Sequence, residues 1–258
     1  MAGVSTVALL ERKPSISRDL FSRYWRDVHG VMAARIPGFA SYVQHHVTPI
    51  LDIGSVAPEL FEGIALVTYA DEADRNGLIN SAVTPHIHRD EQNVFRRVLL
   101  YNLGEGASRA LVRPKHSDDA GLPVFALIEA GQDATAVAAA LEDAGATAID
   151  IHDLTDGDPG GWNDTDVADG GKGRQYGAVV MTRWDTAMAA HEAIAAIVAA
   201  SGGSIAAYRT DAVHVMVDAG RPTALGLRGL DAVNTINQAG ATNQLDRAVE
   251  EAIYGRFG

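Results

Sequence analysis

Cysteine is absent from this chain of 258 residues, which excludes disulfide bonds, thiolate metal sites and cysteine nucleophiles. Basic residues are scarce as well, since 21 lysines and arginines face 33 acidic residues and leave a formal net charge of −12. Such a field repels nucleic acid and anionic membrane surfaces, so neither is expected as a partner. The lack of cysteine fits the reducing cytoplasm, which is the compartment we expect.

Long hydrophobic runs are lacking too. The longest apolar run, residues 193–200, is far shorter than the ~20 residues that a membrane-spanning helix needs. The first ten residues have no basic start and predict a strand, not a leader peptide. We therefore expect no membrane anchor, while a hydrophobic content of 47% suffices for a core in one large domain or two ordinary ones.

The first hundred residues predict the order strand, helix, strand, strand, helix, strand. A helix of about five turns begins after Ser17, which can cap it, and ends before Pro37. A weaker helix begins after Asp71. The predicted strands cover residues 4–12, 39–47, 63–69 and 98–103. This order is that of the split βαβ or ferredoxin-like unit.

The same order restarts after residues 104–122, whose mixed composition predicts a linker. The second set has predicted strands at 123–129, 146–154, 176–183 and 204–217, and predicted helices at 133–144 and 185–200. The fold class predicted is therefore α+β, with two ferredoxin-like βαββαβ repeats in residues 1–115 and 121–258. Their bare sheet faces can be buried against each other, either as a pseudo-dimer within one monomeric chain or with further pairing into a homodimer.

Two segments of the second repeat are predicted to lie outside this pattern. Residues 155–174 are acidic and glycine-rich, and we expect a solvated loop, because no stretch has the spacing of an EF-hand. Two short helices, at 230–238 and 243–254, are expected to pack on the second repeat.

Histidines gather in the first repeat, and two of them have neighbours that point to chemistry. His29 shares a helix stripe with Phe21 and Trp25, so a half-buried imidazole is expected there. Such a group can act as a general acid or base, or can be a packed histidine satisfied by one hydrogen bond. Tyr42 and His46 share one face of a strand, and His45 points to the other.

Two further histidines, His86 and His88, could offer metal ligands from one side of a strand. No HExxH motif or facial triad accompanies them, and Arg89 with Asp90-Glu91 indicates a helix start, so no metal is predicted. Walker A, GxSxG and GxGxxG motifs are also missing, and nucleotide-binding and serine-hydrolase functions lack their usual marks.

Several short motifs together resemble the EthD family of the dimeric α+β barrel superfamily. They are Arg12-Lys-Pro, the segment 21–29 with Tyr-Trp-Arg-Asp-Val-His, Ile36-Pro-Gly and Tyr42-Val-Gln-His-His, with further similarity through most of residues 4–105. Residues 123–217 look like a degenerate second copy without the Trp-Arg-Asp-Val-His segment. The resemblance implies a barrel of two ferredoxin-like units, and one active pocket per chain.

The resemblance also implies a function, since related proteins include cofactor-independent isomerases, cyclases, dehydratases, decarboxylases and monooxygenases. We expect a cofactor-independent lyase or isomerase acting on a small cyclic or aromatic carbonyl metabolite, with His29, Tyr42, His46 and Asp90 as catalytic residues. Substrate contacts are expected from Phe21, Tyr24, Trp25, His45, His86 and His88. The alternatives are a non-catalytic binding protein for a hydrophobic metabolite and a cofactor-independent or haem-dependent monooxygenase.

Overall fold

The computed structural model describes residues 3–51, 53, 60–113, 121–154, 165–168 and 176–255. The first unit contains β1 (Val4–Arg12), α1 (Arg18–Tyr24), the π-helical turn η1 (Trp25–His29), α2 (Gly30–Ala33), β2 (Phe39–Pro49), β3 (Gly63–Tyr69), α3 (Glu72–Gly77), the 3-10 turn η2 (Leu78–Asn80), α4 (Thr84–Val94) and β4 (Phe95–Leu103). Its strands lie in the order β4-β1-β3-β2, all antiparallel. This is the predicted ferredoxin-like arrangement.

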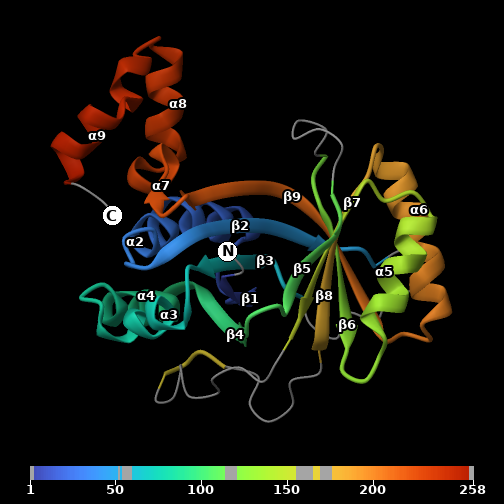
Figure 1. Ribbon diagram of the computed structural model, residues 1–258. Helices are drawn as coiled ribbons and strands as arrows, with labels where there is room; N and C mark the ends of the chain where they lie inside the picture. Colours follow the sequence, from blue (N-terminus) through green and yellow to red (C-terminus); the bar gives the residue numbers. More distant parts are fainter. Residues whose placement is uncertain are drawn as a thin grey trace.

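The second unit repeats this topology. It contains β6 (Val124–Glu129), α5 (Ala134–Asp143), β7 (Ala148–Asp153), β8 (Tyr176–Arg183), α6 (Ala187–Ala200) and β9 (Ile205–Asp218). Its strand order is β9-β6-β8-β7, and α5 and α6 cover one face of the sheet (Figure 1). The predicted fold class, α+β with two ferredoxin-like repeats in one chain, is confirmed.

The two sheets are joined by strand pairing on one side and by the chain itself on the other. On one side β2 pairs with the second part of β9, whose first part pairs with β6. On the other side β4 pairs with β1, and the next strand along the chain, β5 (Ser108–Val112), pairs with β7. The prediction of a linker over 104–122 was therefore wrong for residues 108–112. Their side chains are not fully buried and show no apolar alternation, and the free edge of β7 is what makes them a strand.

The described residues form three hydrophobic cores. One fills the space between the first sheet and its helices, and includes Trp25 and Phe95. A second, rich in alanine and isoleucine, lies between the second sheet and α5 and α6. The third combines residues of both units, such as Leu9 and Phe125, on the inner faces of the two sheets. The bare faces are thus buried against each other, as the sequence predicts.

Each unit also contributes apolar residues to the core of the other. Ile50, which follows β2, is buried in the second core and donates its N–H to the carbonyl of Ala207, 2.9 Å away. Val167, between β7 and β8, is buried in the first core, and its neighbour Ala168 accepts a 2.8 Å bond from the N–H of Val98. Val167 therefore departs from the solvated loop expected for 155–174, while Asp166 and Ala168 are exposed as that prediction requires. Residues 155–164 and 169–174 lie outside the described residues.

The C-terminal helices pack on the first unit, and the prediction that they pack on the second was wrong. They are α7 (Ala224–Arg228), α8 (Leu230–Gln238), the turn η4 (Thr242–Leu245) and α9 (Arg247–Tyr254). A short strand, β10 (Arg221–Pro222), connects β9 to α7, and β9 ends beside β2, so the chain emerges over α2 (Figure 1). There Arg35 donates to the carbonyl of Leu227, and the side chain of Asp27 accepts from the N–H of Leu230.

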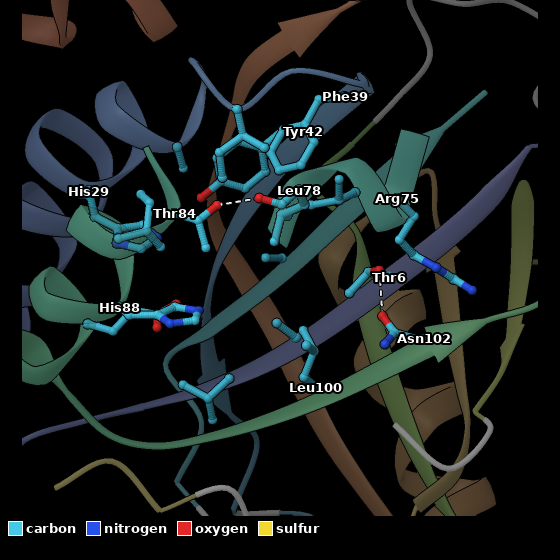
Figure 2. A pocket seen from close by; sticks show the side chains of 18 of the residues that line it. Thr6, His29, Phe39, Tyr42, Arg75, Leu78, Thr84, His88, Leu100 and Asn102 are labelled. Atoms are coloured by element: carbon cyan, nitrogen blue, oxygen red, sulfur yellow. Dashed lines mark hydrogen bonds between the residues drawn. The ribbon is translucent and has the colours of Figure 1, made fainter. Parts of the chain in front are cut away.

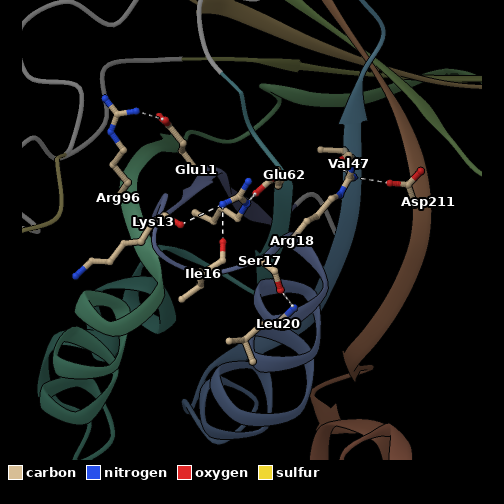
Figure 3. A network of polar contacts seen from close by, with 11 residues as sticks. Glu11, Lys13, Ile16, Ser17, Arg18, Leu20, Val47, Glu62, Arg96 and Asp211 are labelled. Atoms are coloured by element: carbon tan, nitrogen blue, oxygen red, sulfur yellow. Dashed lines mark hydrogen bonds and ion pairs between the residues drawn. The ribbon is translucent and has the colours of Figure 1, made fainter.

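Two arginines fix the start of α1, the helix that leads to η1 (Figure 3). Arg12 donates to the carbonyl of Ile16 at 2.6 Å and forms an ion pair with Glu62, which holds the turn between β1 and α1. Arg18 donates to the carbonyl of Val47 on β2 and to the carboxylate of Asp211 on β9, both at 2.6 Å. The helix is therefore tied to both sheets.

Among the described residues, no helix has both the length and the apolar character that crossing a membrane requires.

Candidate functional site

A cavity of about 560 Å³ lies between the first sheet and its helices (Figure 2). Residues of β1, β3 and β4 form its floor, and η1, α2, η2 and α4 line the other side. The volume is within the range of roughly 300–1,000 Å³ that is usual for small-molecule sites. The lining is mostly apolar and also contains polar groups. Figure 2 shows His29, Tyr42, Thr84 and His88 toward one side of the cavity and Thr6, Arg75 and Asn102 toward the other.

The turn that carries His29 is π-helical and not the regular α-helix predicted from the sequence. The carbonyl of Trp25 accepts the N–H of Gly30 and also a 2.9 Å bond from Nε2 of Gln44 on β2. A Cβ on Gly30 would lie 2.5 Å from that amide nitrogen, so only glycine allows the approach. Single π-helical turns within α-helices occur often at functional sites, because they redirect the side chains that follow.

His29 is buried and opens onto the cavity. Its Nδ1 lies 3.0 Å from Oδ2 of Asp90 on α4, and its ring stands edge-on to Phe95, with 5.4 Å between the ring centres. Since an ionised carboxylate only accepts hydrogen bonds, Nδ1 carries the hydrogen. Among the residues that the structure describes, none bonds Nε2, which is left with its lone pair as a base.

Asp90 holds two groups at once. Its Oδ1 accepts a 2.5 Å bond from the hydroxyl of Tyr24, and its Oδ2 faces His29. Burial by itself raises the pKa of the Asp90 carboxyl, but the bonds from His29 and Tyr24 outweigh it and hold the pKa below its ordinary value. Asp90 is therefore a stable anion that fixes the imidazole.

Tyr42 brings a phenol to the same part of the cavity. Its hydroxyl accepts a 2.8 Å bond from Gln44, and burial, the dominant cause, raises its pKa well above 10. The phenol therefore keeps its hydrogen and can donate it to an oxygen in the cavity. Thr84 and Glu91 of α4 also line this part. Arg89 with the acidic pair Asp90-Glu91 indicates the start of a helix here, but nothing in the sequence indicates that Thr84 or Glu91 lines a cavity.

His46 lies away from the cavity although it shares the strand face of Tyr42. The ring of Trp25 lies between, 4.5 Å from the His46 ring. Nδ1 of His46 is 2.7 Å from the hydroxyl of Ser22, and burial lowers its pKa to about 3. The structure therefore does not bring His46 to His29.

Three other predicted residues lie outside the cavity lining. His45 points to the inner face of the sheets, 5.0 Å from the ring of Phe125, and burial lowers its pKa to about 4. Phe21 packs on Trp25 and Phe95 as part of the core. Tyr24 donates its hydroxyl to Asp90, while Trp25 does line the cavity.

His86 and His88 belong to α4, so the helix indicated by Arg89 with Asp90-Glu91 is present and the two histidines do not share one side of a strand. Positions two apart on a helix of 3.6 residues per turn point to nearly opposite sides. His86 is exposed, and His88 lines the cavity beside His29 (Figure 2). In the described part of the chain, no group of three or more histidine, aspartate or glutamate side chains could hold a metal ion.

Comparison with known proteins identifies a domain family for the segment that carries this cavity. Residues 13–95 match the family model of the EthD domain, which confirms the resemblance seen in the sequence. This stretch runs from the turn after β1 to the first residue of β4 and contains His29, Tyr42 and Asp90. No curated protein matches the chain.

Solved structures with a similar course of the chain have little sequence in common with it. One is an anthrone oxidase-like protein, with a TM-score of 0.49 and 10% identity over 83% of this chain and 94% of that chain. A protein of Fusobacterium nucleatum subsp. nucleatum named "Putative monooxygenase" has a TM-score of 0.46 and 7% identity over 83% and 94%. A "putative monooxygenase" of Lactobacillus acidophilus NCFM has 0.40 and 9% over 83% and 92%. Likeness at this level says nothing about the reaction.

Proposed function

Since the chain carries an EthD domain at residues 13–95, we propose that the cavity of this domain is the active site of a cofactor-independent lyase or isomerase. Its substrate is a small cyclic or aromatic carbonyl compound, and its chemistry is proton transfer next to the carbonyl. The observation that carries the proposal is the His29–Asp90 pair, which presents an unbonded Nε2 to a mainly apolar cavity.

The reaction begins when Nε2 of His29 removes a proton from the carbon next to the carbonyl group. The electrons of the C–H bond form an enolate, whose oxygen accepts the hydrogen of the Tyr42 hydroxyl. The imidazolium that forms is stabilised by the Asp90 carboxylate. His29 then returns the proton to a different carbon, which gives an isomer, or to a leaving hydroxyl, which gives water and an alkene.

The surroundings of His29 suit this step. An apolar lining weakens competing hydration and strengthens the hydrogen bond between Tyr42 and the developing negative charge. A carboxylate on Nδ1 fixes the orientation and the tautomer of the ring. A protein that only bound an apolar metabolite would gain nothing from a buried anion at this place, which is why catalysis is favoured over simple binding.

The proposal is tested by hydrogen exchange with 2-tetralone, a small cyclic ketone with acidic protons beside its carbonyl. In D₂O, the wild-type protein should accelerate deuterium uptake at those carbons, measured by proton NMR. The His29→Ala variant should lose ~10²- to 10⁴-fold of the acceleration, and Tyr42→Phe ~10²- to 10³-fold. Exchange that is no faster than in buffer, or that is unchanged in His29→Ala, contradicts the proposal.

Two controls complete the experiment. His86→Ala replaces an exposed histidine of the same domain and should leave the exchange rate unchanged. Parallel incubations under argon and under air, with an oxygen electrode, separate the proposed chemistry from oxygenation. Oxygen uptake with ring hydroxylation would assign a monooxygenase and overturn the lyase or isomerase reaction.

A further inference from the structure

We infer that the cavity has a second recognition end, far from His29, that binds a neutral oxygen at the opposite end of the substrate. This inference rests on the proposed function, because it identifies which carbonyl compounds the site takes: flat, elongated ring systems that carry a hydroxyl or carbonyl oxygen at the end away from the reacting carbon.

The strands of the floor indicate the length of the cavity. Strand β1 contributes Leu10, Ala8 and Thr6 to the lining, in that order along one face. Leu10 and Thr6 are four positions apart, and at about 3.3 Å per residue this part of the lining spans roughly 13 Å. Leu10 is paired with Val98 and Thr6 with Asn102 of β4, so both strands run the whole length of the floor.

His29 lies at one end of the cavity. Its ring contacts Phe95, which begins β4 and is paired with Arg12 of β1, beyond Leu10. Thr6, Asn102 and Arg75 lie at the opposite end (Figure 2). A molecule that reacts at His29 and fills the cavity therefore reaches this other group of polar residues.

The end of the cavity away from His29 carries polar side chains. The hydroxyl of Thr6 donates to Oδ1 of Asn102 at 3.0 Å. Tyr69 lies beside Thr6, and burial, the main cause, raises its pKa to about 12, so it stays a neutral phenol. Thr6 and Tyr69 are both buried. Polar groups are costly to place in an apolar lining, and they are a normal means of orienting a bound molecule.

Arg75 completes this end and decides the charge of the group that binds there. Its Nη1 donates to the carbonyls of Ser5 and Leu103, at 3.1 and 2.8 Å, and its Nη2 donates to the carboxylate of Glu72 at 2.5 Å. The guanidinium is thus held rigidly, and its charge is already balanced by Glu72. A neutral oxygen suits this arrangement better than a carboxylate, which Glu72 would repel.

The floor between the two ends favours a flat molecule. Ala8 of β1 and Ala65 of β3 are paired directly across the two strands, and both line the cavity. Because both side chains are single methyl groups, they take little space at the centre of the floor. Leu78 and Ile87 are among the helical residues that line the other side of the cavity. A fused ring system fits between these surfaces and keeps its polar atoms at the two ends.

The test compares 2-tetralone with 6-hydroxy-2-tetralone, which differ only in a hydroxyl on the ring opposite the ketone. Dissociation constants are measured by ligand-observed NMR. The wild-type protein should bind the hydroxylated ketone about tenfold more tightly, the value of one well-formed hydrogen bond in a dry site. Thr6→Val has nearly the same shape without the hydroxyl and should reduce the ratio to about one, with the affinity for 2-tetralone unchanged.

Further variants keep the outcome clear. Thr68→Val makes the same substitution on β3, where the Thr68 hydroxyl contacts Ser41 and does not line the cavity, and it should retain the ratio. Arg75→Met should also reduce the ratio. If Arg75→Met does not fold, the result for Thr6→Val alone tests the inference.

The two proposals can fail separately. A wild-type ratio near one, or a ratio unchanged in Thr6→Val, overturns the second recognition end whatever the exchange rate is. A ratio that depends on Thr6 and persists in His29→Ala supports the recognition end even where exchange with deuterium is absent, and only the proposed reaction is then lost.

Discussion

Nδ1 of His29 lies 3.0 Å from Oδ2 of Asp90, although the two residues are 61 positions apart in the chain. The contact joins η1, which follows the first strand, to α4, which precedes the fourth. Both side chains are buried, with exposed fractions of 8% and 9%. The bond determines which nitrogen of the imidazole faces the cavity, so the proposed chemistry depends on it.

We predict that Asp90→Asn changes the protonation of this imidazole. In the wild-type protein, ¹⁵N-resolved NMR of His29 should show the hydrogen on Nδ1. An asparagine can present its amide nitrogen in place of the oxygen, and the tautomer with the hydrogen on Nε2 should then gain population. The rate of exchange with 2-tetralone should fall ~10- to 100-fold. An unchanged tautomer in the variant would show that Asp90 does not orient the ring.

The π-helical turn leads to a prediction about two glycines. Gly30→Ala should destabilise the protein by about 1–3 kcal/mol, because the new methyl group would collide with the Trp25 carbonyl and the Gln44 amide. Gly77→Ala is the matched control, since Gly77 ends α3 and nothing lies within 4 Å of its added Cβ. That variant should be as stable as the wild type or more stable by up to about 1 kcal/mol. Urea unfolding measures both, and equal effects would contradict the role of the turn.

Alternation predicts the two faces of β2 from Tyr42 onward, but not at Phe39, which lines the cavity with Tyr42 because the register shifts between Phe39 and Ser41. Tyr42 faces the helices and His45 faces the interior between the sheets, as their positions on β2 require. Alternation does not show what stands above a strand. The ring of Trp25 separates His46 from the cavity, and its place follows from the course of η1, which departs from the regular helical spacing used for the prediction.

The distant end of the cavity could not be predicted, for a different reason. Thr6, Asn102 and Arg75 come from β1, β4 and α3, and only the strand order β4-β1-β3-β2 brings them together. Each is an ordinary residue in its local segment. Likewise, β5 is a strand because it meets the edge of β7, and nothing in its own five residues indicates that partner.

Buried neutral histidines lead to a prediction about acid stability. Burial lowers the pKa of His45 to about 4, that of His46 to about 3, and that of His214 to about 4, from an ordinary value of 6.5. Because the unfolded chain binds these protons first, their contribution to stability is complete above pH 6.5 and is lost as the pH falls toward 4. Each group removes up to about 1.4 kcal/mol per pH unit in that window.

The measurement is the free energy of unfolding between pH 7 and pH 5. We expect a clear loss in the wild-type protein, of which His45 contributes about 1–2 kcal/mol. His45→Gln cannot be protonated, so its stability should fall less steeply over the same range. A variant with the same slope as the wild type would show that His45 is not held neutral by burial.

The exchange of apolar residues between the two units gives the last prediction. Val167 of the second unit is buried in the core beside the cavity, and the carbonyl of Ala168 holds the N–H of Val98. We expect Val167→Ala to cost about 1–2 kcal/mol and to speed hydrogen exchange at the Val98 amide, because the strand-like contact with β4 loosens. Ile50→Ala, its counterpart in the other core, should instead speed exchange at the Ile50 amide, which is bonded to Ala207. If either variant affected both amides alike, the contacts would report on global unfolding. Separate effects would show that the two contacts open independently, and that carbonyls of the second unit locally stabilise the segments of the first unit that carry these amides.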